Sequence, residues 1–252
     1  MSTAPLALET RGLSKSFGAL VVARGIDFRL PVGARHALIG PNGAGKTTFI
    51  DLVTGRLAPS AGQILLAGTD VTSLSSEKRV KRGIGRTFQI TALFPGLSVL
   101  ENVLLAVRER QGAADDMLHF AGSRRDLVEE SEALLERLGL ADHAARTVRE
   151  LPYGQQRLVE IAITLGLKPK VLLLDEPAAG VPSTESGLIL DIVESLGRDI
   201  AVLIIEHDMD LVFRLAERIT VMVQGAILVE GTPQEIAADP RVRAVYLGTE
   251  AE

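Results

Sequence analysis

The chain contains no cysteine and no tryptophan among its 252 residues, and it has only four histidines. Without cysteine it forms no disulfide, no thiolate metal site and no cysteine nucleophile. The histidines are too far apart in sequence for a local zinc motif, at His36, His119, His143 and His207. These absences exclude disulfide-stabilised folds and cysteine chemistry, and a reducing compartment is the expected environment.

Long hydrophobic runs are also missing, although the mean hydropathy is +0.24. The longest apolar runs are Val171–Leu174 and Ile200–Ile205, far below the roughly 18 residues of a membrane-spanning helix. The first residues carry no basic region and no sustained apolar region, so we expect no secretory signal there. The hydrophobicity therefore predicts a buried core with short apolar strands, typical of a parallel sheet covered on both faces.

An excess of positive charge is absent as well, because the chain has 27 basic and 32 acidic residues and a net charge of −5. Sequence-independent binding of duplex nucleic acid needs a concentrated basic surface. We therefore expect no nucleic-acid partner.

Apolar periodicity predicts short strands around one helix in the first seventy residues and alternating helices and strands after Gly154. The expected strands are Ala34–Ile39, Gly62–Gly68, 171–174 and 200–205, and the expected helices are Lys46–Val53 (ending at Gly55), 155–165, 183–196 and 208–217. A hairpin turning at Gln224–Gly225 and two short helices near Pro233 and Pro240 are predicted for the last part.

The middle of the chain, Ser98 to about Gly139, has a helical pattern instead. The predicted fold is therefore an α/β class P-loop core, a mostly parallel sheet with flanking helices, plus N-terminal antiparallel strands and an inserted helical subdomain. We expect one domain over 1–252, with the helical subdomain at 90–165.

The segment from Gly40 to Thr47 matches the P-loop pattern G-x-x-x-x-G-K-[S/T] between a predicted strand and a predicted helix. Its glycines let backbone N–H groups close around phosphate oxygens, and the helix N-terminus adds partial positive charge. The candidate nucleotide-binding residues are Gly40, Pro41, Asn42, Gly43, Ala44, Gly45, Lys46, Thr47 and Thr48. Guanine specificity is not expected, since the chain has only two asparagines and neither starts an N-K-x-D motif.

Ionisable residues follow two other apolar strands of the predicted sheet. Asp175 and Glu176 follow the run at 171–174. At this end of the strand Asp175 could bind Mg²⁺, and Glu176 could orient or deprotonate the water molecule that attacks the phosphate. His207 follows the strand at 200–205 and could contact a γ-phosphate at the same edge. The alternatives are that the carboxylates cap the next helix and that the histidine is structural.

The order of these motifs resembles the ATP-binding subunits of ABC transporters. The resemblance rests on SKSFG with Phe17, the P-loop, RTFQ with Gln89, LPYGQ at 151–155, LLLDEP at 172–177 and His207. Within that family the chain is similar to the branched-chain amino acid importer type. That closer likeness rests on LFPGLSVLENV, YGQQR, EPAAG, IEHDM and the ending RVRAVYLG.

The resemblance implies roles for these residues. Phe17 would stack on adenine, and Lys46, Gln89, Glu176 and His207 would be the catalytic residues. Mg²⁺ would be held by Thr47, Gln89 and Asp175. The ATP of a partner subunit would be contacted by Pro152, Tyr153, Gly154 and Gln155.

The resemblance also implies partners. These are a second ATP-binding subunit in a head-to-tail homo- or heterodimer, membrane-spanning permease subunits and an extracytoplasmic substrate-binding protein. The chain would then lie peripherally at the cytoplasmic face of the inner membrane.

Two positions depart from the family pattern. Pro152 and Tyr153 replace the serine and first glycine of the L-S-G-G-Q signature, so the serine hydroxyl contact is lost. Pro182 stands where the family often has an aspartate between the subunits.

The expected function is an Mg²⁺-dependent ATPase that powers import of branched-chain or related amino acids. The alternatives are the energy subunit of a lipid or lipopolysaccharide exporter, a nucleotide-gated dimerising module with weak turnover, and a soluble ATPase acting on ribosomes or DNA.

Overall fold

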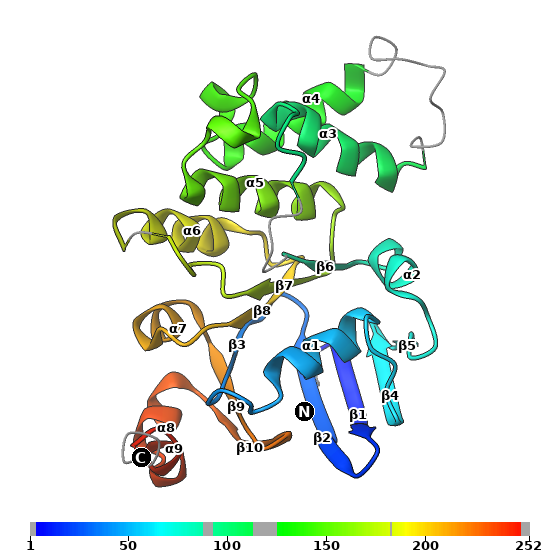
Figure 1. Cartoon of the computed structure of the whole chain (residues 1–252), viewed down its shortest axis with the longest axis vertical. Coiled ribbons are helices and arrows are strands. Elements are labelled where there is room, and N and C mark those ends of the chain that lie inside the picture. Colours follow the sequence, from blue (N-terminus) through cyan, green and yellow to red (C-terminus); the bar gives the residue numbers. More distant parts are fainter. Residues whose placement is uncertain (1–3, 88–92, 113–124, 182, 248–252) are drawn as a thin grey trace. The chain divides into compact units, whose positions relative to one another are not determined.

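The computed structural model of the chain describes residues 4–87, 93–112, 125–181 and 183–247 (Figure 1). The chain divides into two compact units. The first contains residues up to 84, 170–176 and 196 onward, and the second contains 85–169 and 177–195. Each unit is therefore assembled from segments that are far apart in the sequence.

The first unit begins with an antiparallel sheet of order β2-β1-β4-β5. Its strands are β1 (Leu6–Phe17), β2 (Leu20–Pro31), β4 (Ala61–Leu66) and β5 (Thr69–Asp70). The predicted antiparallel pairing is confirmed, but the prediction of short strands is wrong, because β1 and β2 have 12 residues each. Register shifts between Thr10 and Lys15 mark bulges, which let so long a pair twist without losing its pairing.

A second sheet has the order β10-β9-β3-β8-β7-β6. Its strands are β3 (Arg35–Ile39), β6 (Ile84–Arg86), β7 (Val171–Asp175), β8 (Ala201–Ile205), β9 (Arg218–Val223) and β10 (Ala226–Gly231). Strands β7, β8, β3 and β9 run parallel, and β10 is antiparallel to β9. All residues of β3, β7 and β8 are buried, which confirms the predicted apolar, mostly parallel sheet.

Four helices of the first unit lie close to their predicted positions, namely α1 (Lys46–Thr54), α7 (Met209–Leu215), α8 (Pro233–Ala238) and α9 (Pro240–Leu247). A further helix of this unit, α2 (Ser76–Lys81), was not predicted. Helix α1 ends at Gly55, whose φ is 78° and whose N–H donates to the carbonyl of Leu52. The turn of the β9–β10 hairpin is at Gln224–Gly225, as predicted.

Alternate residues of β3 pack into different parts of the core, because successive side chains of a strand point to opposite faces. Leu38 belongs to a cluster with Phe28 of β2 and Phe49 of α1. Ala37 and Ile39 belong to another cluster, which includes residues of α7, α8 and α9. Both faces of the central sheet are thus covered within the first unit.

The second unit contains most of the remaining helical segments. They are α3 (Val99–Arg110), α4 (Arg125–Arg137), α5 (Tyr153–Gly166), α6 (Ser183–Ser195) and the 3₁₀ turns Ala141–His143 and Val148–Glu150. Helix α3 begins with a capping box of Ser98 and Glu101. Arg110, at its end, pairs with Glu130 of α4 at 2.7 Å. This pairing, with Lys168 also on Glu130, lowers the pKa of Glu130 to about 2.

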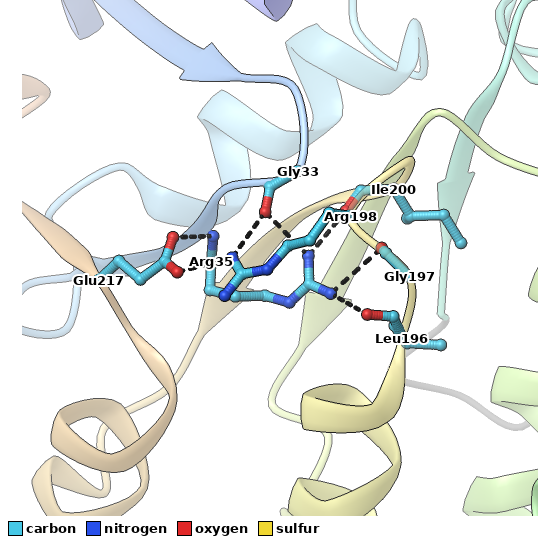
Figure 2. A network of polar contacts seen from close by, with 7 residues as sticks. All are labelled: Gly33, Arg35, Leu196, Gly197, Arg198, Ile200 and Glu217. Atoms are coloured by element: carbon cyan, nitrogen blue, oxygen red, sulfur yellow. Dashed lines mark hydrogen bonds and ion pairs between the residues drawn. The ribbon is translucent and has the colours of Figure 1, made fainter.

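Arg35, the first residue of β3, is buried among backbone carbonyl groups (Figure 2). Its guanidinium donates to the carbonyls of Ile200 at 2.7 Å and Leu196 at 2.6 Å, and to those of Gly33 and Gly197 at 3.2 and 3.3 Å. Burial lowers the pKa of Arg35 from its ordinary value. One cation therefore satisfies three carbonyls of the loop that leads into β8 and one carbonyl of the turn before β3.

Replacing Arg35 with methionine is expected to lower the free energy of unfolding by about 2–4 kcal/mol, because the carbonyls are left without a donor in a buried site. Urea denaturation measures the change. Arg198→Met is the matched control, since Arg198 binds Gly33 and Glu217 of the same network from an exposed position. It should cost under about 1 kcal/mol. Equal losses for the two variants would contradict a structural role specific to Arg35.

Candidate functional site

Three parallel strands of the first unit end beside one another. Asp175 of β7 is level with Ile205 of β8, and Leu38 of β3 is level with Ile205 on the other side. The P-loop follows β3, Glu176 follows β7 and His207 follows β8. The carboxyl ends of parallel strands are where open α/β sheets bind ligands. The fold thus brings the three predicted strand-end motifs to one edge.

The P-loop places an uncapped helix end at this edge. Gly45, the N-cap of α1, has φ of 99° and provides no side-chain hydrogen bond, so the first N–H groups of α1 are not capped by a side chain. Gly40 has φ of 152°, and a Cβ there would overlap the carbonyl oxygen of Met222 in β9. Only glycine fits at Gly40, because β9 packs directly against the start of the loop.

Lys46, the first residue of α1, points back into the loop. Its ammonium donates to the carbonyls of Gly40 at 2.5 Å and Pro41 at 3.1 Å. Burial lowers the pKa of Lys46, while the charges of Glu176 and Asp175 raise it. The loop therefore holds a cation beside two carboxylates, ready to exchange its carbonyl partners for phosphate oxygens.

Glu176 has an unusual backbone for a residue with a side chain, with φ of 49°. Its N–H donates to the carbonyl of Ile205 at 2.9 Å, which fixes the turn after β7. The carboxylate Oε1 atom lies 3.0 Å from Nε2 of His207. A left-handed non-glycine residue costs of order 1–3 kcal/mol, and such strain is typical of active sites. The geometry places a carboxylate and an imidazole together, as a pair able to hold a water molecule.

Asp175 and Thr47, two of the predicted Mg²⁺ ligands, both carry side-chain oxygen atoms, which are the atoms that Mg²⁺ prefers. Asp175 is 2% exposed at the end of β7, and the Thr47 hydroxyl lies in the first turn of α1. In the described part of the chain, no group of three or more His, Cys, Asp or Glu side chains could hold a metal by itself.

An open cavity of about 560 Å³, within the size range of ligand sites, lies beside the P-loop. Its lining includes the predicted Glu176 and His207 and the P-loop residues 42–48. It also includes residues that the motifs did not point to, namely Leu20, Val21, Val22 and Arg24 of β2, Ile205 of β8, and Gln224 and Gly225 of the β9–β10 turn. Of these residues, the sequence had indicated only Gln224 and Gly225, as a turn. The others could not be found because no motif indicates which strands lie beside the loop.

Phe17, the predicted adenine-stacking residue, is at the end of β1 with 53% of its surface exposed. Its ring centroid is 4.9 Å from the ammonium of Lys15, and the ring is not part of the cavity lining. Gln89 and Pro182, which the sequence also singled out, lie outside the described residues.

The signature-like segment belongs to the second unit. Pro152 is the N-cap of α5 and provides no side-chain hydrogen bond, so Tyr153, Gly154 and Gln155 form an uncapped first turn. Tyr153 is 41% exposed, and its ring packs over Arg157 at 5.2 Å. The buried Oε1 atom of Gln155 has no hydrogen-bond partner among the described residues. The turn thus presents backbone N–H groups where the family signature has a serine.

Residues 23–179 match the ABC transporter family, which is more than half of the chain. The chain belongs to the ABC transporter family. Residues 226–252 of this cassette match a second family, described as branched-chain amino acid ATP-binding cassette transporter. The family predicted from the ordered motifs is confirmed, and because it is a family of ATPases, the cassette binds nucleotide and hydrolyses ATP.

Two relatives match the cassette over nearly their whole length. The cassette is 37% identical over 250 residues to BraF of Pseudomonas aeruginosa, a high-affinity branched-chain amino acid transport ATP-binding protein, covering 96% of the cassette and 97% of BraF. It is also 37% identical over 248 residues to LivG of Escherichia coli, described in the same words, covering 96% and 97%.

A solved structure of similar fold is the ADP conformation of an ATP-binding cassette of an ABC transporter. It has a TM-score of 0.86 and 31% identity, and the match covers 98% of this cassette and 100% of that chain. The predicted α/β P-loop fold class is therefore confirmed. No helix within the described ranges is long and apolar enough to cross a membrane.

Proposed function

We propose that the cassette powers the import of branched-chain or related amino acids by hydrolysing ATP. The observation that carries the proposal is the match to BraF and LivG over nearly their whole length, since both are described as branched-chain amino acid transport ATP-binding proteins. The family match over residues 226–252 supports the same substrate class.

In the proposed site the P-loop binds the phosphates, and Glu176 and His207 activate the water molecule. The backbone N–H groups of residues 42–48 donate to the phosphates, and the Lys46 ammonium contacts the β- and γ-phosphates. Glu176 takes a proton from the water whose oxygen attacks the γ-phosphorus, as ADP leaves, and His207 orients Glu176 through their 3.0 Å contact.

The remaining site assignments are proposed on the same basis. Mg²⁺, when bound, supplies positive charge to the phosphates, and Thr47, Asp175 and Gln89 would hold it. Phe17 would stack on the adenine of the nucleotide.

The proposed assembly is a head-to-tail pair of cassettes. In it the uncapped first turn of α5, Pro152 to Gln155, faces the γ-phosphate held by the partner subunit. Proline donates nothing, so the N–H groups of Tyr153, Gly154 and Gln155 replace the missing serine hydroxyl. Hydrolysis removes the γ-phosphate that joins the two surfaces, and the pair opens.

The pair would act on permease subunits at the cytoplasmic face of the inner membrane, together with an extracytoplasmic substrate-binding protein. We propose that residues 1–252 act as one ATP-binding domain, with the helical subdomain at 90–165.

Reconstitution with the permease subunits encoded beside the cassette tests this function. We expect a binding protein loaded with leucine, isoleucine or valine to raise the ATPase rate several-fold in proteoliposomes, because substrate delivery drives closure of the cassettes. The unloaded binding protein is the control. Stimulation by lipid or lipopolysaccharide and not by amino acids would instead assign the cassette to an exporter.

A further inference from the structure

Arg24 lies on β2 with its side chain exposed and is part of the lining of the nucleotide cavity. Its neighbour Ala23 is fully buried in the core cluster. Successive residues of a strand face opposite sides, so Arg24 shares the cavity-facing side with Val22. The strand thus presents a cation to the cavity.

The backbone at Arg24 is connected to the P-loop by two hydrogen bonds. The N–H of Arg24 donates to the carbonyl of Gly225 at 2.8 Å, and the N–H of Gly225 donates to the carbonyl of Ala44 at 2.9 Å. A Cβ on Gly225 would lie 2.5 Å from the carbonyl oxygen of Val22, so the strand and the turn are in close contact. The backbone of Arg24 therefore has a fixed position relative to the loop.

Among the described residues, the Arg24 side chain differs from the other cationic side chains nearby in having no charged or hydrogen-bonding partner. Arg11 and Arg29, on the same sheet, both pair with Glu9, at 2.8 and 3.7 Å. Lys46 is buried and bonded to loop carbonyls. Across the described ranges, the Arg24 guanidinium has no carboxylate partner and no other side-chain hydrogen bond. Among the cations that the structure describes at this cavity, Arg24 is thus the one whose side chain gives up no partner when it takes an anionic ligand.

The place of Arg24 along the cavity indicates which part of a nucleotide it meets. The apolar residues Leu20 and Val21 of the same strand suit the base, and Lys46 and Glu176 mark the γ-phosphate end. Between them lies Gly45, the last glycine of the loop. A Cβ on Gly45 would be 3.0 Å from the carbonyl oxygen of Val22 and 3.3 Å from the Cα of Gly225, the residue to which the Arg24 N–H bonds. This middle stretch corresponds to the sugar and the α-phosphate.

We propose that Arg24 is a nucleotide-binding residue whose guanidinium contacts the α-phosphate. The proposal rests on the nucleotide site described above and adds to it a second cation, from the antiparallel sheet. A guanidinium pairs well with phosphate oxygens, and its long side chain reaches across an open site. Because the α-phosphate is common to ATP, ADP and AMP, Arg24 contributes to the binding of all three.

Titration of Arg24→Gln with ATP and ADP, and competition with AMP and adenosine against a fluorescent ADP analogue, test the proposal. We expect about threefold to tenfold weaker binding of ATP, ADP and AMP alike, and unchanged binding of adenosine, which lacks phosphate. Arg24→Lys, which keeps the charge, should lose no more than about twofold.

Arg29→Gln is the matched control, because it removes the same charge from the same strand at a position paired with Glu9. If Arg24→Gln binds ATP and ADP as tightly as Arg29→Gln does, the role of Arg24 is overturned while the nucleotide site stands. A loss for ATP alone, or an equal loss for adenosine, also overturns it, because the contact would then lie at the γ-phosphate or the base. If the wild-type cassette binds no nucleotide, the proposed function and this proposal both fail.

Discussion

Replacing Glu176 with glutamine is expected to lower the ATPase rate of the cassette by at least about 100-fold while leaving ATP affinity within about twofold of wild type. Glutamine has the same shape but accepts no proton, so the water beside it is no longer activated. The left-handed backbone and the 2.9 Å bond to Ile205 do not depend on the carboxylate. Release of inorganic phosphate measures the rate, and ATP titration measures the affinity.

The same variant should accumulate as an ATP-bound dimer in size-exclusion chromatography, because the γ-phosphate that joins the subunits is not removed. Glu132→Gln is the control, since Glu132 is exposed on α4 and should keep the wild-type rate. A rate near wild type for Glu176→Gln would show that another group activates the water.

Lys46→Ala is expected to weaken ATP binding by about tenfold to 100-fold. The variant removes the ammonium that is proposed to contact the β- and γ-phosphates, a charge-assisted contact in a partly buried site. It also frees the carbonyls of Gly40 and Pro41, so the loop loses the two bonds that shape it. Isothermal titration with ATP measures the affinity, and circular dichroism checks that the variant is folded.

Lys78→Ala is the control for Lys46, because Lys78 lies on the exposed surface of α2 in the same unit. Its ATP affinity should match wild type. An ATP affinity for folded Lys46→Ala within twofold of wild type would refute the assignment of the P-loop as the phosphate site. The two variants separate binding from chemistry, because Lys46→Ala loses affinity whereas Glu176→Gln loses turnover.

Most elements of the first unit could be predicted because their signals are local. The helix after Gly45 and its end at Gly55, the buried strand 171–175 and the hairpin at Gln224–Gly225 all lie within about two residues of their predicted bounds. Caps, glycine turns and unbroken apolar runs act over a few residues, so short windows of sequence record them.

The lengths of β1 and β2 could not be predicted in the same way. Only part of β1 is buried, and its pattern is interrupted by bulges, so the alternation that identifies a half-buried strand is weak. What holds the two strands together is their pairing with each other and with β4, which is a property of the sheet.

The sequence by itself determined the family of this protein, through the order of its motifs. Gly40 to Thr47, Asp175, Glu176 and His207 predict a phosphate site and its carboxylates, because their types and spacing match what a nucleotide requires. Only the tertiary structure decided which residues complete the wall of that site. Strand order places β9 beside β3, so the Gln224–Gly225 turn reaches the P-loop from a position far away in the chain, and the N–H of Arg24 bonds to this turn. Such contacts depend on long-range strand pairing, which leaves no pattern in any short window of sequence.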